Sequence, residues 1–247
     1  MNGRRSAFDI LVIADGAASV LPMQVGLAVA ATQYKWGALW GMFDVDNWPS
    51  ERTLEQRYHT TRRMFGLMPT ARVADKLRLS LFWSLPVSEY ANWKASPLEQ
   101  WKSELLTLWP ESAPIVDQIE SHSQLTFASY HHARPMRLAN PPICIAGDAA
   151  HAMSPQLGLG ATLAVQDALV LAECVDAYGP IEGLQRYGRR RLPTVRAYQL
   201  LSRTLTPCFQ ADSNGLWRDL LFATGLYIPG VQKLMYRSVA ESISERA

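Results

Sequence analysis

The residues with the clearest chemical signature follow a short apolar run in the second half of the chain. Residues 143–167 read ICIAGDAAHAMSPQLGLGATLAVQD, in which Gly147 and then Asp148 follow the apolar run. A strand that ends here brings a carboxylate to the edge of a sheet, where ligands of open α/β sheets bind. The Pro/Gly loop after it lets backbone approach a flat ligand closely. The complete pattern favours a binding site over a plain turn at Asp148.

A helix is predicted to begin near Gly160. The run that follows, to about residue 177, is apolar on almost every side, which predicts a buried helix. The first N–H groups of a helix lack intrahelical acceptors, and its dipole is positive at this end. Such a start stabilises negative charge or an electron-rich carbonyl. We therefore expect Asp148 and this helix start to face one ligand.

A second strand of the same kind lies near the N-terminus. Residues 10–14 form a continuous apolar run, which is followed by Asp15 and Gly16. A run without alternation suits a strand buried on both faces, as in a parallel sheet. Because carboxyl ends of parallel strands meet at one edge, Asp15 and Asp148 are expected at the same crevice. Asp15 can equally be interpreted as a turn residue that ends the strand.

Residues 147–160 resemble the second FAD-contacting motif of the flavin-dependent aromatic hydroxylases, the para-hydroxybenzoate hydroxylase class, written roughly G-D-A-A-H-x-x-x-P-x-x-G-x-G. The resemblance implies that Asp148 binds the ribityl hydroxyls and that Pro155 packs beside the isoalloxazine ring. Residues 9–19, DILVIADGAAS, are similar to the D-G motif of that family, associated with FAD and the NAD(P)H pyrophosphate. The implied cofactor-binding residues are Asp15, Gly16, Gly147, Asp148, Pro155, Gly158 and, through N–H groups at the pyrimidine edge, Gly160, Ala161 and Thr162; no catalytic residue is assigned.

The chain departs from that family at the phosphate end of the cofactor. A GxGxxG unit, which cradles a dinucleotide pyrophosphate, is found nowhere among its 15 glycines. Without that unit the parallel sheet is expected to keep an open edge and an uncovered apolar face, which invites a partner chain. We therefore expect a homo-oligomer or a complex with a complementary N-terminal FAD-binding half.

The rest of the chain predicts an α/β fold with an α+β insert. Residues 23–48 and 71–90 are rich in Val, Leu and aromatic residues with partial alternation, which predicts a mostly antiparallel sheet. Further predicted elements are a helix at 97–120, a strand at 125–130, a basic amphipathic helix at 181–206 and a helical remainder with breaks at Pro207 and Pro229. The expected domains are a partial FAD-binding domain (1–22 and 135–195), a substrate-binding sheet region (23–134) and a C-terminal helical segment (196–247).

Several other residue types permit chemistry, and for each a structural role is favoured. Aromatic residues of the sheet region can line an apolar pocket, although sheet core is the commoner role: they are Trp36, Trp40, Phe82 and Trp83. For His151 we favour capping or core satisfaction over acid–base chemistry. His131 and His132 are expected on a surface loop. A solvated helix face is expected for the basic run of Arg186, Arg189, Arg190, Arg191 and Arg196.

Composition excludes several classes of protein. The 247 residues are 48% apolar and 19% charged, which is typical of a globular chain with a sizeable core. The net charge of +2 argues against a nucleic-acid partner. The cysteines, Cys144, Cys174 and Cys208, form no CxxC pair, so neither a metal site nor a disulfide framework is predicted. No apolar run approaches the ~18 residues of a membrane span, and a cytoplasmic location is expected.

The resemblance implies a flavin-dependent monooxygenase. Such an enzyme would hydroxylate an aromatic or polyketide-like small molecule with O2 through a flavin C4a-hydroperoxide, and NADPH or NADH would reduce the FAD. Two alternatives stand beside it. One is a flavin-free remnant that serves as a partner subunit or scaffold, and the other is a non-redox enzyme, a cyclase or isomerase, that uses the same pocket.

Overall fold

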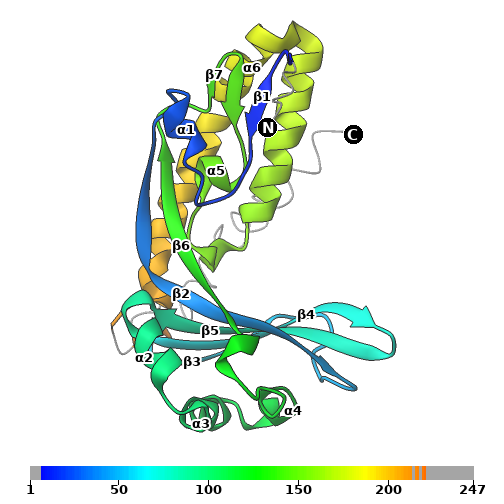
Figure 1. The fold of residues 1–247 in the computed structure, drawn as a ribbon, viewed down its shortest axis with the longest axis vertical. Coiled ribbons are helices and arrows are strands. Elements are labelled where there is room, and N and C mark those ends of the chain that lie inside the picture. Colours follow the sequence, from blue (N-terminus) through cyan, green and yellow to red (C-terminus); the bar gives the residue numbers. More distant parts are fainter. Residues whose placement is uncertain (1–6, 213–214, 217–218, 221–247) are drawn as a thin grey trace, which may run out of the picture. The chain divides into compact units, whose positions relative to one another are not determined.

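The computed structural model describes residues 7–212, 215–216 and 219–220 (Figure 1). The chain forms two compact units. Unit 1 contains residues 7–34 and 130–205, and unit 2 contains residues 35–129 and the described residues after 205. In the described part of the chain, no helix has both the length and the apolar character that crossing a membrane requires.

Unit 1 contains a three-stranded sheet in the order β1-β8-β7. Strand β1 (Leu11–Ile13) runs parallel to β8 (Ile143–Ile145), and β7 (Ala139–Asn140) pairs with β8 in the antiparallel direction. The predicted parallel pair is therefore confirmed. The expected burial of β1 on both faces is wrong, because Leu11 is 51% and Val12 39% exposed. In the sheet as described, β1 is an edge strand, so its outer side lacks a covering neighbour.

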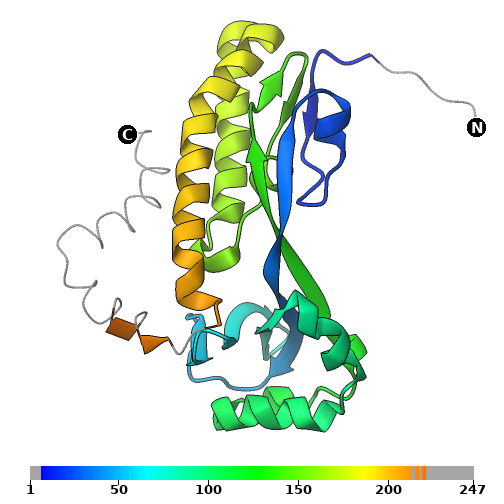
Figure 2. The same cartoon turned by 90° about the vertical axis from the view of Figure 1, so that its left-hand side faces the viewer.

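Three helical elements follow β8: α5 (Asp148–His151), η4 (Pro155–Leu157) and the long α6 (Gly160–Phe209). Helix α6 is interrupted at Gly179, whose φ of 73° and ψ of 175° are non-helical, and Pro180 begins its second half. Figures 1 and 2 show the two halves side by side. The predicted helix at 181–206 is confirmed. The predicted break at Pro207 is wrong, since α6 continues to Phe209, and Pro229 lies outside the described residues.

The first half of α6 is buried on one face only. Leu163 and Cys174 belong to the core of unit 1, whereas Val165 is 60% and Leu169 43% exposed. The expectation of a helix buried all round is therefore wrong, because the sheet and the second half of α6 cover one side of it. The core of unit 1 is built around Ile13, Leu27, Leu138, Ile145, Leu184, Tyr187 and Val195.

Unit 2 is built on a five-stranded sheet in the order β3-β4-β5-β2-β6. Its strands are β2 (Val29–Val45), β3 (Glu55–His59), β4 (Arg63–Val73), β5 (Lys76–Pro86) and β6 (Thr126–Pro135), of which β2 begins and β6 ends in unit 1. The pairs β2–β5, β3–β4 and β4–β5 are antiparallel, which confirms the predicted sheet. β3 and the first half of β4 were not predicted. His131 and His132 lie half-buried within β6, so their expected place on a surface loop is wrong.

Short helices cover one face of this sheet (Figure 1). They are η1 (Val87–Glu89), α2 (Tyr90–Ala95), α3 (Leu98–Leu108), η2 (Pro110–Ser112), α4 (Ala113–Val116) and η3 (His122–Gln124). The helix predicted at 97–120 ends at Leu108, because Pro110 starts a separate turn. In unit 1, the short helix α1 (Leu21–Gln24) leads into β2.

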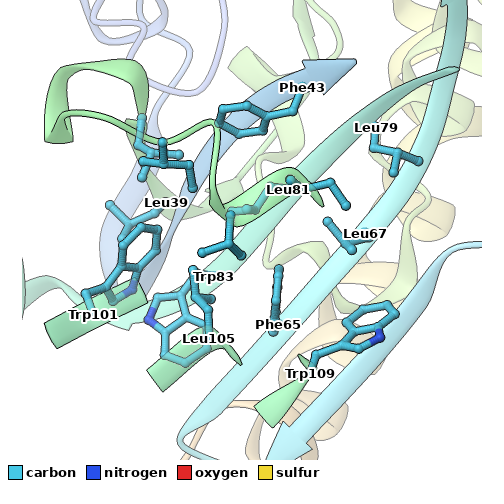
Figure 3. Packing of buried hydrophobic residues seen from close by; sticks show 14 of the residues in the cluster. Leu39, Phe43, Phe65, Leu67, Leu79, Leu81, Trp83, Trp101, Leu105 and Trp109 are labelled. Carbon is cyan, nitrogen blue, oxygen red and sulfur yellow. The ribbon is translucent and has the colours of Figure 1, made fainter. Parts of the chain in front are cut away.

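Large aromatic side chains fill the space between the sheet of unit 2 and its helices (Figure 3). The rings of Trp83 and Trp101 meet edge-on with centroids 6.3 Å apart, and those of Phe65 and Trp109 do so at 5.4 Å. The core role favoured for Trp83 is confirmed. Its neighbour Phe82 points to the other face of the sheet, where it lies opposite Trp40 and both are half-buried.

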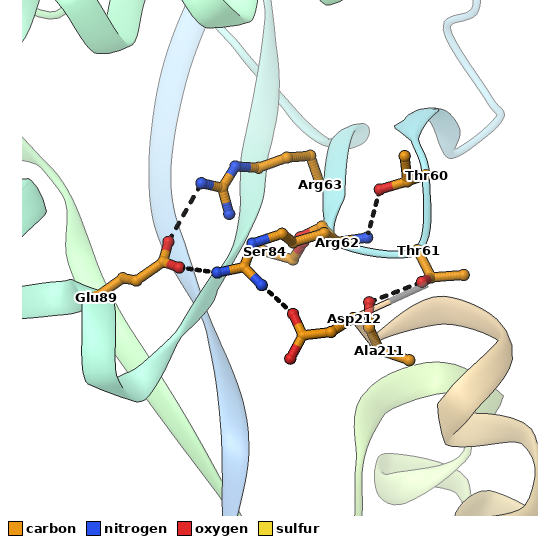
Figure 4. A network of polar contacts seen from close by, with 8 residues as sticks. All are labelled: Thr60, Thr61, Arg62, Arg63, Ser84, Glu89, Ala211 and Asp212. Atoms are coloured by element: carbon orange, nitrogen blue, oxygen red, sulfur yellow. Dashed lines mark hydrogen bonds and ion pairs between the residues drawn. The ribbon is translucent and has the colours of Figure 1, made fainter. Parts of the chain in front are cut away.

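A polar network joins the chain after α6 to the β3–β4 turn within unit 2 (Figure 4). Arg62 forms ion pairs with both Glu89 and Asp212. The Thr61 hydroxyl donates to the Ala211 carbonyl at 2.7 Å. These contacts give residues 211 and 212 a defined place beside the sheet.

Candidate functional site

The two motifs singled out in the sequence meet at one edge of the sheet of unit 1. Ile13 of β1 and Ile145 of β8 are paired in parallel register, and the Ala146 N–H donates to the Ile13 carbonyl at 3.0 Å. Asp15 and Gly147 each follow two residues after this pair. Asp15 is exposed, and Gly16 turns the chain with a φ of 97°. The predicted meeting of the two strand ends is thus observed.

Asp148 presents a free carboxylate at this edge. It is the first residue of α5 and is exposed, and within the described part of the chain its carboxylate forms no hydrogen bond or ion pair. Gly147 before it has a φ of 59° and a ψ of −147°, a backbone conformation that side chains disfavour. A methyl group placed on Gly160 would lie 3.9 Å from Asp148 Oδ1. The carboxylate therefore stands directly in front of the start of α6.

The start of α6 offers unpaired donors beside that carboxylate. Gly158, in the left-handed conformation with a φ of 63°, ends the turn that Pro155 begins, and Pro155 itself is exposed. The Leu163 N–H donates to the Leu159 carbonyl at 2.9 Å. The N–H groups of residues 160–162, which precede this bond, belong to the first turn and have no acceptor within the helix. Added bulk at Gly158 would meet nothing within 4 Å, so the approach is open.

A buried ionic cluster holds the site in place from behind. The carboxylate of Asp167, on the first half of α6, accepts from His151 Nε2 at 2.7 Å, from the Gly147 N–H at 2.9 Å and from Arg191 Nε at 2.7 Å. Asp167 and His151 are fully buried, and Arg191 is 5% exposed. The cluster ties both halves of α6 to the turn that carries Asp148.

Asp167 is ionised within this cluster. Burial opposes its negative charge, but the hydrogen bonds from His151, Gly147 and Arg191, together with the charge of His151, hold the pKa of Asp167 below its ordinary value. A buried carboxylate with three donors is satisfied electrostatically, so the cluster fixes geometry.

Two members of the cluster correct or extend the sequence analysis. Arg191 is buried, so the solvated face expected for the basic run is wrong at this position, while Arg186, Arg189, Arg190 and Arg196 are exposed. The structural role favoured for His151 is confirmed by its burial and its bond to Asp167. Asp167 was not singled out, although a lone carboxylate within an apolar helix was a signal that a buried partner must exist.

The arrangement has a defined chemical capacity. The free carboxylate of Asp148 can accept hydrogen bonds from ligand hydroxyl groups, and the first-turn N–H groups at residues 160–162 can stabilise an anionic or carbonyl edge. Because residues 147, 158 and 160 are glycines, no side chain blocks the backbone between the Asp148 carboxylate and these N–H groups. These residues fit the sugar-alcohol chain and the pyrimidine edge of a flavin.

Comparison with known sequences decides the family. Residues 7–201 match the family described as FAD binding domain, and this match covers most of the chain. The chain belongs to the FAD binding domain family. The resemblance found at residues 147–160 is thereby confirmed at the level of the family.

Curated relatives of this FAD binding domain chain match it over short segments. One is an FAD-dependent monooxygenase of Aspergillus terreus, 48% identical over 65 residues, which cover 25% of this chain and 15% of the relative. Another is 3-amino-4-hydroxybenzoate 2-monooxygenase PtmB3 of Streptomyces platensis, 48% identical over 61 residues, or 24% of this chain and 15% of the relative. The matched segments thus span less than a sixth of these relatives.

Solved structures share the fold over most of the chain. PqsL of Pseudomonas aeruginosa, a probable FAD-dependent monooxygenase, matches with a TM-score of 0.70 at 21% identity, over 85% of this chain and 59% of its own. HpxO of Klebsiella pneumoniae, solved with FAD and uric acid, matches with a TM-score of 0.72 at 20% identity, over 95% of this chain and 61% of its own. The predicted fold class is confirmed, and the chain spans about three-fifths of these structures.

Proposed function

We propose that this chain provides the ribityl- and pyrimidine-binding part of an FAD site in a monooxygenase. The observation that carries the proposal is the free carboxylate of Asp148 at the start of α6, where its Oδ1 would lie 3.9 Å from a methyl group placed on Gly160. The family match and this free carboxylate favour a flavin over a flavin-free scaffold or a cyclase.

Each residue of the site has a distinct part in the proposal. Asp148 accepts hydrogen bonds from the ribityl hydroxyls, and the N–H groups of Gly160, Ala161 and Thr162 meet the pyrimidine edge. Because these donors are fixed before any charge develops, they stabilise negative charge on a reduced ring without reorganisation. Bound FAD would supply the redox and oxygen chemistry.

The other residues of the set shape the approach to the ring. We call Asp148 and the N–H groups of residues 160–162 the cradle. Pro155 is exposed next to the cradle and offers an apolar surface for a planar ring. Asp15 and Gly16 follow the end of β1, the strand next to β8, and so lie at the same end of the sheet as Asp148. Gly147 and Gly158 hold positive-φ turns that a side chain would strain.

The proposed reaction is hydroxylation of an aromatic or polyketide-like small molecule with O2, and NADPH or NADH is the reductant. The aromatic pair Trp40 and Phe82, half-buried on the sheet face of unit 2 away from its core, supports a planar substrate. The names of the relatives, which include a 3-amino-4-hydroxybenzoate 2-monooxygenase, support the same substrate class.

The exposed edge of the unit 1 sheet supports a partner in this function. Phe8 is 81% exposed and Leu11 51%, and among the described residues no strand pairs with the outer side of β1. Such an edge accepts a further strand readily. We propose that a second copy or a complementary FAD-binding segment covers it.

The proposal is tested by titrating the chain with riboflavin, which contains the ribityl chain and the ring but no phosphate, and following flavin fluorescence. Asp148→Ala is expected to weaken binding by about tenfold or more, since a hydrogen bond to a charged group contributes about 1.5–3 kcal/mol. Asp176→Ala, at an exposed carboxylate on the first half of α6, is the control and should leave affinity unchanged. Equal affinity in wild type and Asp148→Ala would refute the assignment.

A further inference from the structure

A row of arginines that form no ion pair among the described residues runs along the second half of α6. Arg189, Arg196 and Arg203 are spaced by seven residues, so they lie on one face of the helix at steps of roughly 10 Å. Arg196 and Arg203 line a cavity of about 480 Å³ in unit 1 together with Arg134, which lies near the end of β6. We call this cavity the arginine pocket; its walls also include Pro135, Gln199 and Leu200.

The arginine pocket holds three cations and no anion. In the part of the chain that the structure describes, none of Arg134, Arg196 and Arg203 forms an ion pair, and no acidic residue lines the pocket. The arginines on the other faces of α6 behave differently. Arg186 pairs with Glu182 at 2.6 Å, and Arg190 pairs with Glu173 at 3.0 Å.

The like charges in the pocket repel one another. Burial and the charge of Arg134 lower the pKa of Arg203, and burial together with the charge of Arg203 lowers the pKa of His132 on the adjacent strand. The whole chain has a net charge of only +2, so the three positive charges in the pocket do not simply reflect a basic composition. An anion in the pocket would relieve the repulsion.

A buried hydrogen bond ties one wall of the pocket to β6. Gln199 is 4% exposed, and its side-chain amide donates to the Ala133 carbonyl of β6. One turn along, the hydroxyls of Ser202 and Ser154 lie 2.6 Å apart and both are buried. A concave site of this volume, with apolar walls and convergent polar groups, is typical of a preformed small-molecule pocket.

We propose that the arginine pocket binds the phosphate group of a small phosphorylated molecule, with Arg134, Arg196 and Arg203 as donors. Guanidinium groups match phosphate oxygens in paired hydrogen bonds, and three of them balance the two or more charges of a phosphate ester. A cavity of about 480 Å³ suits a compact ligand better than an extended polyanion. The site is separate from the cradle at Asp148 and does not depend on the proposed flavin function.

Calorimetric titration of the full chain with inorganic pyrophosphate tests the proposal. We expect one site per chain. Arg203→Gln and Arg196→Gln should each weaken binding by about tenfold or more. The matched control is Arg186→Gln, which removes the same charge from an exposed, paired position of the same helix and should change affinity by less than about twofold. Arg203→Gln should also keep the melting temperature of wild type, because it removes repulsion.

A second arm separates a soluble ligand from a lipid headgroup. Phosphatidylcholine vesicles with and without phosphatidic acid are sedimented with wild type and with Arg203→Gln. Pyrophosphate binding that depends on Arg203, without vesicle binding, supports the proposal. It is overturned if wild type binds no pyrophosphate, if Arg186→Gln weakens binding as much as Arg203→Gln, or if only the anionic vesicles bind.

Discussion

At the scale of single residues, Asp167 holds the site together through its hydrogen bonds, although no motif singled it out. It accepts hydrogen bonds from three groups that are distant in sequence, and it links the Asp148 turn to both halves of α6. Loss of one partner leaves a charge buried without compensation, which costs more than the intact pair contributes. The position of Asp148 therefore depends on a fully buried residue.

Arg191→Met is expected to lower the free energy of unfolding by about 3–5 kcal/mol, because Asp167 then loses its guanidinium partner in a buried site. Urea denaturation measures the change. Arg190→Met, at the neighbouring exposed arginine that pairs with Glu173, should cost about 1 kcal/mol or less. Equal losses in the two variants would contradict the cluster.

Asp167 also predicts a pH dependence of stability. Its pKa is depressed in the folded chain, so its stabilising contribution is complete above the ordinary aspartate pKa of about 3.9 and is lost as the pH falls towards the folded value. Between about pH 5 and pH 3, the unfolding free energy of wild type should therefore fall more steeply than that of Asp167→Asn. Denaturation curves that run parallel over this range would show that Asp167 is not the linked group.

At the scale of elements, the turn within α6 decides which residues meet. Gly179 reverses the chain, and the two halves approach so closely at Gly183 that an added methyl group would lie 2.6 Å from the Cys174 carbonyl oxygen. The approach brings Arg191 back to Asp167, 24 residues earlier. The hairpin therefore helps to hold the Asp148 turn in place through the bond between Arg191 and Asp167.

Gly183→Ala should lower the free energy of unfolding by about 1–3 kcal/mol, since the backbone of the facing half must move. Gly188→Ala is the matched control within the same helix half. Its methyl group would lie 3.4 Å from Ala139 Cβ, and alanine favours the helix by about 1 kcal/mol, so its melting temperature should equal or exceed that of wild type. The idea of a close contact fails if Gly183→Ala is as stable as Gly188→Ala.

Where several strands and helices begin and end could be predicted from the sequence. Which of their residues are buried could not. The strand ends at Asp15 and Asp148, the helix start at Gly160 and the second half of α6 follow from short-range signals, and the structure has all of them. The exposure of Leu11 and Val165 depends on which elements cover each face, and the burial of Arg191 depends on the hairpin. Such tertiary neighbours leave no periodic trace in one sequence.

At the scale of the whole molecule, the chain matches only part of the solved structures that share its fold. It spans about three-fifths of the structures that share its fold, and residues 147–160 are proposed to bind the ribityl and ring portion of a flavin. The exposed edge of β1 and the arginine pocket are two further surfaces of unit 1. They are distinct from the cradle at Asp148, so each can be tested without disturbing the others.

The most direct test of the flavin site is a titration of the isotopically labelled chain with riboflavin, followed through its backbone amide resonances. We expect the amides of Gly160, Ala161 and Thr162 to shift in proportion to bound flavin, and Asp148→Ala to move the midpoint of these shifts to a riboflavin concentration about tenfold higher or more, while its other resonances stay in place. Saturation with riboflavin that leaves these three amides unmoved and shifts residues elsewhere would contradict the proposed site.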